Sequence, residues 1–262
     1  MKRISIFNNY SNNHQNRRNR VAKQLKEAGF TPMSNGDIIV VIGGDGTFLS
    51  AVKDRYKENP LFVGLNGGNL GFFSEFPYSD SKKLIQMLAQ GQYEVVEYPI
   101  YEVEITQRNG IIHRDIFFND ISVERIGTKI IHMETTINKT SKLNFSADGI
   151  VVSTALGSGA YNMAAAGAVS MELTPTIQIT TVAQQRNKIY RSALNPILLN
   201  ETSLVEIAPE NKKKRPFRVV ADGRELKTRN PQKVTIYKSN KTFKVIRSKS
   251  FNYSSHVIDK LF

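Results

Sequence analysis

The sequence predicts an α/β, Rossmann-like N-terminal domain followed by a β-rich, β-sandwich-like C-terminal domain. In the first hundred residues, short apolar runs alternate with segments of helical periodicity, which is the pattern of a parallel sheet covered by helices. After Pro99, apolar and polar residues alternate with period two between turn residues, which is typical of antiparallel strands. The predicted division is 1–98 for the α/β domain, 99–238 for the β-rich domain, and 239–262 for a tail that returns to the first domain or to an interface.

In the α/β domain, strands and helices alternate along the chain. Residues 37–42 form an almost continuous apolar run, as expected of a parallel strand buried on both faces. A helix is predicted over residues 15–29, with Gly29 as its end, and the apolar residues on one of its faces are Val21, Leu25 and Ala28. The other predicted elements are strands at 2–7 and 61–65 and helices at 47–56 and 79–89.

In the β-rich domain, short strands are predicted wherever the period-two alternation holds. These stretches are 101–105, parts of 116–124 and 130–137, 204–207, 217–221 and 234–237. One segment, residues 160–171, is rich in small residues and is predicted to be helical.

The composition excludes several classes of protein. The 262 residues contain no cysteine, so there is no disulfide framework, thiol nucleophile or thiolate metal site. No apolar run approaches the ~20 residues of a membrane span and no signal peptide is recognisable, so a soluble cytoplasmic protein without a membrane partner is expected. The four histidines, His14, His113, His132 and His256, lack metal-ligand spacing and are interpreted as surface or structural residues.

The net charge of +13 fits a polyanionic small ligand or a nucleic acid. Each basic cluster, at 17–20 and 212–215, is interpreted either as a solvated loop or as a contact for an anion. No zinc-finger, leucine-zipper or RNA-recognition signature accompanies them, so a nucleic-acid partner is not expected.

The strongest functional signal is Gly43-Gly44-Asp45-Gly46-Thr47, between a buried strand and a helix. Ligands of open α/β sheets bind at the carboxyl ends of the strands, and glycines allow backbone amides to approach a phosphate closely. Asp45 is out of place in a phosphate cradle unless it has another role. We interpret it as a general base that takes the proton of a substrate hydroxyl during phosphoryl transfer. The structural alternative is an N-cap for the following helix.

Four further stretches carry polar or glycine-rich turns. Residues 66–73 follow a buried strand and include Phe72 and Phe73, either of which could stack on a base or belong to the core. The Asn119-Asp120 pair enters a strand and could bond a base edge and a ribose, or form an Asx turn. Residues 147–162 place a hydroxyl- and glycine-rich loop before a small-residue helix, with Tyr161 as a platform for a ring, and the turn at 222–223 reads in isolation as a hairpin.

In this order and spacing, these stretches resemble the motifs of the NAD kinase family. Residues 43–47 match the family's GGDGT motif, and residues 66–72 resemble its N-x-G-x-L-G-F loop. Residues 119–120 resemble its Asn–acid pair, residues 148–161 its D-G…S-T-x-x-G-S-x-A-Y segment, and the turn at 222–223 fits as well. The likeness covers nearly the whole chain.

The resemblance implies phosphorylation of the 2′-hydroxyl of the adenosine ribose of NAD to give NADP, with ATP or inorganic polyphosphate as the donor. Asp45 would be the base and Gly46 would lie against the dinucleotide. The other implied binding residues are Phe72 at the adenine, Asn119 and Asp120 at the adenine and a ribose, Asp148 at the nicotinamide end, and Ser158, Gly159, Ala160, Tyr161, Asn162, Met163, Ala164 and Ala183 along the site. It also implies a divalent metal, expected to be Mg²⁺ held by the donor phosphates, and a cytoplasmic homo-oligomer, either a tetramer or a dimer.

The chain departs from the family at Ala155, Leu156 and Gly159, where the family carries a proline and two hydroxyl residues. Losing a hydroxyl that bonds a ligand costs ~1 kcal/mol or more, so weaker or altered dinucleotide binding is expected. The alternatives are a lipid kinase of the diacylglycerol type, which shares GGDGT, and a non-catalytic paralogue that binds dinucleotides or associates with nucleic acid.

Overall fold

The computed structural model describes residues 3–8, 12–67, 71–185, 195–210 and 215–262. Residues 68–70 of the second predicted loop and 212–214 of the second basic cluster lie outside the described residues. The chain divides into two compact units. Unit 1 consists of Met1–Pro99 with Lys241–Phe262, and unit 2 consists of Ile100–Asn240.

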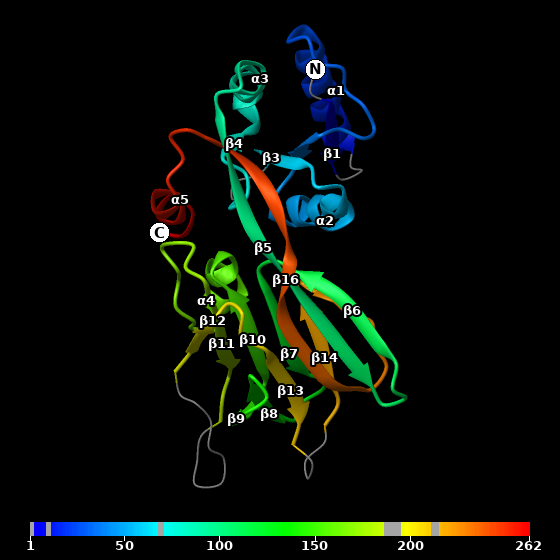
Figure 1. Ribbon diagram of the computed structural model, residues 1–262, viewed down its shortest axis with the longest axis vertical. Helices are drawn as coiled ribbons and strands as arrows, with labels where there is room; N and C mark the ends of the chain where they lie inside the picture. Colours follow the sequence, from blue (N-terminus) through cyan, green and yellow to red (C-terminus); the bar gives the residue numbers. More distant parts are fainter. Residues whose placement is uncertain (1–2, 9–11, 68–70, 186–194, 211–214) are drawn as a thin grey trace. The chain divides into compact units, whose positions relative to one another are not determined.

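A parallel sheet forms the centre of unit 1 (Figure 1). Its strands are β1 (Ile4–Asn8), β2 (Ile38–Ile42), β3 (Leu61–Asn66) and the last part of β16 (Pro231–Ser248), in that order, with β4 (Phe76–Pro77) paired to the end of β3. Every residue of β2 is buried, as predicted from its unbroken apolar run. A central parallel strand reads this way because both of its faces are covered.

Helices cover both faces of this sheet. They are α1 (Asn12–Glu27), α2 (Asp45–Arg55), α3 (Ser81–Gln90) and α5 (Tyr253–Leu261), with single 3₁₀ turns at Tyr56–Glu58 and Tyr78–Asp80. Helices α1 and α3 share one apolar core with alternate residues of β2. On the opposite face, Phe48 of α2 stacks on Phe73, with ring centroids 5.1 Å apart, and tilts against Phe62 of β3.

Helix α1 lies close to its predicted position but begins and ends earlier. Val21 and Leu25 are fully buried, which confirms the predicted apolar face. Ala28 lies beyond the helix end and is exposed, so its assignment to that face was wrong. The chain leaves the helix through Gly29 at φ +83°, where the amide of Phe30 donates to the carbonyl of Leu25 (2.9 Å). Glycine allows this left-handed C-terminal turn without a Cβ penalty.

Unit 2 is a β-sandwich whose two antiparallel sheets enclose one apolar core. One sheet has the order β12-β11-β10-β7-β14-β15, and its strands are β7 (Asp120–Arg125), β10 (Gly149–Thr154), β11 (Thr176–Val182), β12 (Ile197–Asn200), β14 (Phe217–Ala221) and β15 (Arg224–Glu225). The other contains β5 (Tyr93–Gln107), β6 (Ile112–Phe117), β8 (Ile131–Ile137), β9 (Ser141–Ala147), β13 (Val205–Pro209) and the first part of β16. The predicted fold class, an α/β domain with a β-sandwich-like domain, is confirmed.

The predicted helix over residues 160–171 is wrong. Only a 3₁₀ turn at Leu156–Gly159 and one short helix, α4 (Tyr161–Ala164), form. The backbone then folds back over the buried side chain of Asn162, whose Nδ2 donates to the carbonyl of Ala168 (3.1 Å). Ala166 takes a left-handed φ of +62°, which ends the helical path. A side-chain amide therefore replaces the helical hydrogen bonds that the small residues alone would have made.

Candidate active site

Asp45 is the first residue of α2, at the carboxyl end of β2. Its side chain does not cap the helix, because Gly44 occupies the N-cap position and no side-chain cap bond forms. The half-buried carboxylate instead accepts two backbone amides from the turn after β3, Phe72 N–H at Oδ2 (2.8 Å) and Phe73 N–H at Oδ1 (2.9 Å). An ionised carboxylate has about four acceptor positions, so each oxygen keeps one for another donor.

The loops that follow β2 and β3 lie side by side around Asp45. A Cβ added to Gly67 would lie 3.8 Å from the Cα of Gly43, an ordinary contact between the two loops, and 2.5 Å from Nη1 of Arg17, whose side chain would have to shift. Arg17 of α1 donates to the carbonyl of Gly67 (2.7 Å). Gly46 is exposed and has open space where a Cβ would stand. The first turn of α2 and one guanidinium thus offer positive potential beside an acidic side chain.

The first basic cluster lies on helix α1, where Arg20 is exposed to solvent but Arg17 and Arg18 make contacts with the protein. Arg17 and Arg18 are half-buried on α1 and reach the ends of parallel strands, since Arg18 donates to the carbonyl of Ile6 and to Oδ1 of Asn8 (both 3.0 Å). The two aromatic residues after β3 differ in how deeply they are buried. Phe73 is buried in the core, whereas Phe72 is partly exposed and packs edge-on against the ring of Tyr253 (5.7 Å).

In unit 2, the Asn119-Asp120 turn is held by Asp222. The carboxylate of Asp222 accepts the amides of three consecutive residues, Phe118 (3.0 Å), Asn119 (2.7 Å) and Asp120 (3.3 Å). Asp222 itself has φ +47° and Gly223 has φ +73°, which fits the two-residue hairpin loop between β14 and β15. The turn that the sequence alone presents as a simple hairpin therefore shapes a predicted binding residue.

Asp120 and Asp222 form a pair of acids, of which Asp120 is buried and Asp222 is half-buried. Burial, followed by the negative charge of Asp222, raises the pKa of Asp120 to about 7, and the backbone amide of Tyr161 opposes this rise. Burial also raises the pKa of Asp222 to about 6 against the three amides that it accepts. An acid with a pKa near neutrality both donates and accepts protons easily, and such groups gather at functional sites.

The loop after β10 reaches the same corner of unit 2. Thr154 donates from Oγ1 to the carbonyl of Phe118 (2.8 Å) and accepts the amide of Gly157 (3.0 Å). A Cβ on Gly157 would lie 2.1 Å from the carbonyl oxygen of Asn119, so the backbones touch. The structure thus brings residues 119–120, 154–161 and 222 together.

The predicted binding residues of this loop fall into two groups. Ala160, Tyr161, Met163 and Ala164 are exposed and Gly159 is half-buried. Ser158 and Asn162 are buried and serve the fold, because Ser158 Oγ accepts the amide of Ser170 (2.9 Å) and Asn162 Oδ1 accepts the hydroxyl of Thr180 (2.7 Å). Leu156, one of the departures from the family pattern, is 4% exposed and packs into the interior.

Asp148 and Ala183 lie at the other end of β10 from Asp120, although the pKa of the Tyr161 hydroxyl is raised by burial and, to a smaller extent, by the charge of Asp148. Asp148 precedes β10, whereas Asp120 pairs with Ser153 at the far end of the same strand. Five residue steps along the strand, from position 148 to position 153, separate the two positions by about 17 Å. Asp148 forms an ion pair with Arg125 (2.6 Å), and its amide donates to the carbonyl of Val182 beside the exposed Ala183.

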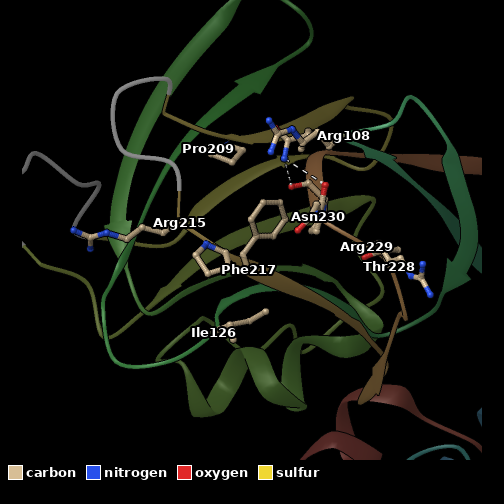
Figure 2. Close-up of a pocket in the computed structure, with 11 residues that line it drawn as sticks. Arg108, Ile126, Pro209, Arg215, Phe217, Thr228, Arg229 and Asn230 are labelled. Carbon is tan, nitrogen blue, oxygen red and sulfur yellow. Dashed lines mark hydrogen bonds between the residues drawn. The ribbon is translucent and has the colours of Figure 1, made fainter.

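Figure 2 shows a pocket of about 690 Å³ in unit 2 that contains none of the predicted site residues. Its floor is the buried ring of Phe217, and three arginines line it, Arg108, Arg215 and Arg229. The side chains of Arg215 and Arg229 extend away from that ring in different directions. Their charges therefore do not converge on one bound anion. A smaller pocket of about 230 Å³ includes Ser158 together with Ser153 and Thr154.

Within the described ranges, no three His, Cys, Asp or Glu side chains gather in a group that could hold a metal ion. The helices that the structure describes include none long and apolar enough to cross a membrane.

The two halves of the chain each match a family model. Residues 5–93 match the ATP-NAD kinase N-terminal domain, and residues 119–248 match the ATP-NAD kinase C-terminal domain. Among curated proteins, NAD kinase 2 of Bacillus subtilis (strain 168) is 32% identical over 243 residues, 87% of this chain and 86% of that protein. NAD kinase 1 of Listeria monocytogenes serotype 4b is 30% identical over 229 residues, 85% of this chain and 84% of that protein.

Solved structures share the fold at lower sequence identity. Yeast NADH kinase complexed with NADH superposes with a TM-score of 0.85 at 17% identity, covering 100% of this chain and 87% of that chain. An NAD kinase from Archaeoglobus fulgidus in complex with ATP superposes with a TM-score of 0.78 at 21% identity, covering 99% of this chain and 98% of that chain. Fold and sequence matches together define a two-domain dinucleotide kinase. The chain belongs to the NAD kinase family.

Proposed function

We propose that this protein is an NAD kinase that transfers a phosphoryl group from ATP, or from polyphosphate, to the 2′-hydroxyl of the adenosine ribose of NAD, giving NADP. The observation that carries the proposal is the carboxylate of Asp45, oriented by two backbone amides inside a glycine loop at the end of a parallel strand. The lipid-kinase alternative has no support, since the matches to both halves of the chain are to NAD kinases.

Asp45 acts as the general base. One of its free lone pairs accepts the proton of the 2′-hydroxyl, and the oxygen attacks the terminal phosphorus of the donor. The new phosphorus–oxygen bond forms as the bond to the leaving phosphate breaks, with the leaving group on the opposite side. The amides at the start of α2 and the guanidinium of Arg17 lie where they can stabilise phosphate charge.

In this proposal the residues that bind the dinucleotide are Gly46, Phe72, Asn119, Asp120 and the exposed part of residues 159–164. A carboxyl with a pKa of about 7 at Asp120 suits a ribose hydroxyl, which donates and accepts hydrogen bonds. Asp148 and Ala183, at the end of β10 about 17 Å from Asp120, contact the same dinucleotide if it is extended or if they come from a second copy of the chain.

A divalent metal, Mg²⁺ in this proposal, accompanies the donor phosphates. The protein groups near Asp45 fit a metal that brings its own phosphate ligands, because both oxygens of Asp45 already accept amides and no acidic cluster surrounds them in the described chain. Mg²⁺ commonly keeps waters and substrate phosphates as ligands and takes only one or two carboxylates. When bound, it neutralises phosphate charge.

We also propose a cytoplasmic homo-oligomer, a tetramer or a dimer. Among the described residues, strand β12 pairs only with β11 and so lies at the edge of one sheet of unit 2, where its Leu198 is 62% exposed. An unpaired strand edge with an exposed apolar side chain favours association with another chain. Light scattering of the purified protein measures the subunit number, and a monomer at assay concentration would contradict this part of the proposal.

The test of the function is turnover by Asp45→Asn. Purified protein with NAD, ATP and magnesium should form NADP, and the substitution should lower kcat by about 10²–10⁴-fold because the base is lost. NAD binding, measured by calorimetry, should stay within a few fold. Undiminished turnover would remove Asp45 as the base, and tight NAD binding with no NADP formed by the wild type would favour the regulatory paralogue.

A further inference from the structure

We propose that His256 is a positioning residue for Asp45 and acts through one peptide group of the Phe72–Phe73 turn. This inference rests on the proposed role of Asp45 as the base. All four residues, His256, Phe72, Phe73 and Asp45, lie in unit 1, and the connection requires α5, an element far from the glycine loop in sequence.

The connection runs through a single peptide plane. Nε2 of His256 lies 2.7 Å from the carbonyl oxygen of Phe72, and the amide nitrogen of Phe73 lies 2.9 Å from Oδ1 of Asp45. That carbonyl and that amide belong to the same planar peptide group, so they point in opposite directions. A hydrogen bond at the carbonyl end therefore fixes the direction of the amide that holds the carboxylate, and it also polarises that amide.

The contact defines the tautomer of His256. A carbonyl oxygen only accepts, so Nε2 must carry the proton. Burial lowers the pKa of His256, and the charges of Arg247 and Lys260 lower it further, while the bond to Phe72 and the charge of Glu75 oppose this. The imidazole therefore donates to Phe72 in its neutral form near pH 7.

The next peptide group is held by Arg247. Its Nη1 donates to the carbonyl of Phe73 (3.0 Å) and its Nη2 to the hydroxyl of Tyr98 (3.1 Å). The guanidinium lies 4.3 Å from the ring centroid of Phe251, which also contacts the ring of His256 at 5.3 Å. Arg247 is 1% exposed, and no ion pair joins it to a carboxylate of the described residues. Burying a charged group costs free energy. The hydrogen bond from the buried guanidinium of Arg247 to the carbonyl of Phe73 therefore supports the view that the geometry of this turn matters.

The C-terminal segment thus donates hydrogen bonds to the carbonyls of Phe72 and Phe73. The amides of the same two residues donate to the carboxylate of Asp45. Ser248 strengthens the attachment, because its amide donates to Oε2 of Glu75 (3.0 Å), three residues after Phe72. A misplaced catalytic group loses rate steeply, about 10²-fold for a 1 Å error. Loss of a hydrogen bond from His256 or Arg247 to this turn should therefore lower turnover without removing any group that touches the substrate.

The experiment compares His256→Phe with His256→Gln in the full-length protein. Phenylalanine keeps a ring among Phe72, Tyr253 and Phe251 but cannot donate, whereas glutamine keeps an N–H donor near the Nε2 position. We expect His256→Phe to lower kcat about ten- to hundredfold with the KM for NAD within about twofold, and His256→Gln to recover much of kcat. Amide hydrogen exchange at Phe73 should be faster in His256→Phe and restored in His256→Gln. His113→Phe, in β6 of unit 2, is the matched control and should change neither quantity.

The outcomes separate this inference from the proposed function. Wild-type kcat in His256→Phe would overturn the positioning role, and so would a lower kcat with unchanged exchange at Phe73 or without recovery by glutamine. Normal turnover by Asp45→Asn would instead refute the base, whatever His256→Phe does. Because exchange at Phe73 is measured without substrate, it judges the hydrogen-bond chain independently of the reaction. Thermal unfolding of each variant shows whether a lower kcat results from misfolding. If His256→Phe is misfolded, the kcat and the Phe73 exchange rate of His256→Gln test the positioning role.

Discussion

Individual carboxylates in this protein acquire different properties from their surroundings. Asp45 is oriented by two amides and keeps lone pairs available, whereas Asp120 is 6% exposed and lies beside the carboxyl of Asp222. The same side chain thus serves as a directed acceptor in one unit and as an acid that titrates near neutrality in the other. Two such environments allow proton transfer and hydroxyl recognition to be assigned to separate residues.

The acid pair predicts that Asp120→Asn stabilises the protein in alkaline conditions. The pKa of Asp120 is about 7 in the folded chain, above its ordinary value of 3.8, so folding favours the protonated form. The stability that this group contributes is complete below about pH 4 and is lost as the pH rises to 7. We expect the variant to raise Tm by about 2–4 °C at pH 8 and by much less at pH 5, while the KM for NAD increases. Equal Tm shifts at both pH values would contradict the assignment.

Individual site residues can be predicted from the sequence where their immediate neighbours form a recognisable pattern. Asp45 stands among three glycines after an apolar strand, and that pattern predicts its loop correctly. The grip of Asp222 on residues 118–120 joins positions about a hundred apart, so no local pattern reveals it. His256, interpreted from the sequence as surface or structural, is buried against Phe72 because α5 packs against the N-terminal part of unit 1.

Among the secondary-structure elements, the turn between β10 and α4 packs directly on the backbone of the Asn119-Asp120 turn. Gly157 leaves no room for a Cβ against Asn119, and its amide is held by Thr154. The turn and the Asn119-Asp120 pair therefore move together. Their position is fixed by backbone contact, which side-chain substitutions elsewhere do not replace.

Gly157→Ala should consequently damage the binding of NAD more than the chemistry. The new methyl group meets the backbone of Asn119 at 2.1 Å, so one of the two segments must shift. We expect the KM for NAD to rise about tenfold or more and Tm to fall by several degrees, with ATP binding less affected. Steady-state kinetics with each substrate varied in turn measure this, and an unchanged KM for NAD would show that the corner is not part of the binding site.

The elements that the sequence predicts well are those with a strong periodic pattern. β2 is buried along its whole length, and β14 spans residues 217–221 as the alternation indicates. Strand β9 has no predicted counterpart because its sequence is mostly polar and it lies at a sheet edge. The small-residue segment after Tyr161 fails as a helix because the tertiary bonds of Asn162 outweigh local propensity.

For the molecule as a whole, the excess of 36 basic over 23 acidic residues should attract its anionic substrates. Arg17, close to the glycine loop, adds a local contribution to this field. The field acts mainly on the encounter and binding of the substrates, not on the chemical step. Salt weakens this effect because charges are screened over about 10 Å at 0.1 M ionic strength.

We therefore expect kcat/KM for both substrates to fall several-fold between 50 and 500 mM potassium chloride, with a smaller change in kcat. Sucrose at matched osmolality, which leaves charges unscreened, is the control. A value of kcat/KM that does not vary with salt would mean that the surplus of positive charge is remote from the site.

Unit 1 is assembled from both ends of the chain, with all of unit 2 encoded between them. A ribosome adds roughly 5–20 residues per second, so the first ninety-nine residues are synthesised about 8–30 seconds before Arg247 and His256. During that interval the carbonyls of Phe72 and Phe73 lack the hydrogen bonds from His256 and Arg247. The nascent polypeptide therefore stays catalytically incompetent until translation of its closing helix, and a premature stop codon there would yield a nearly full-length yet poorly active product.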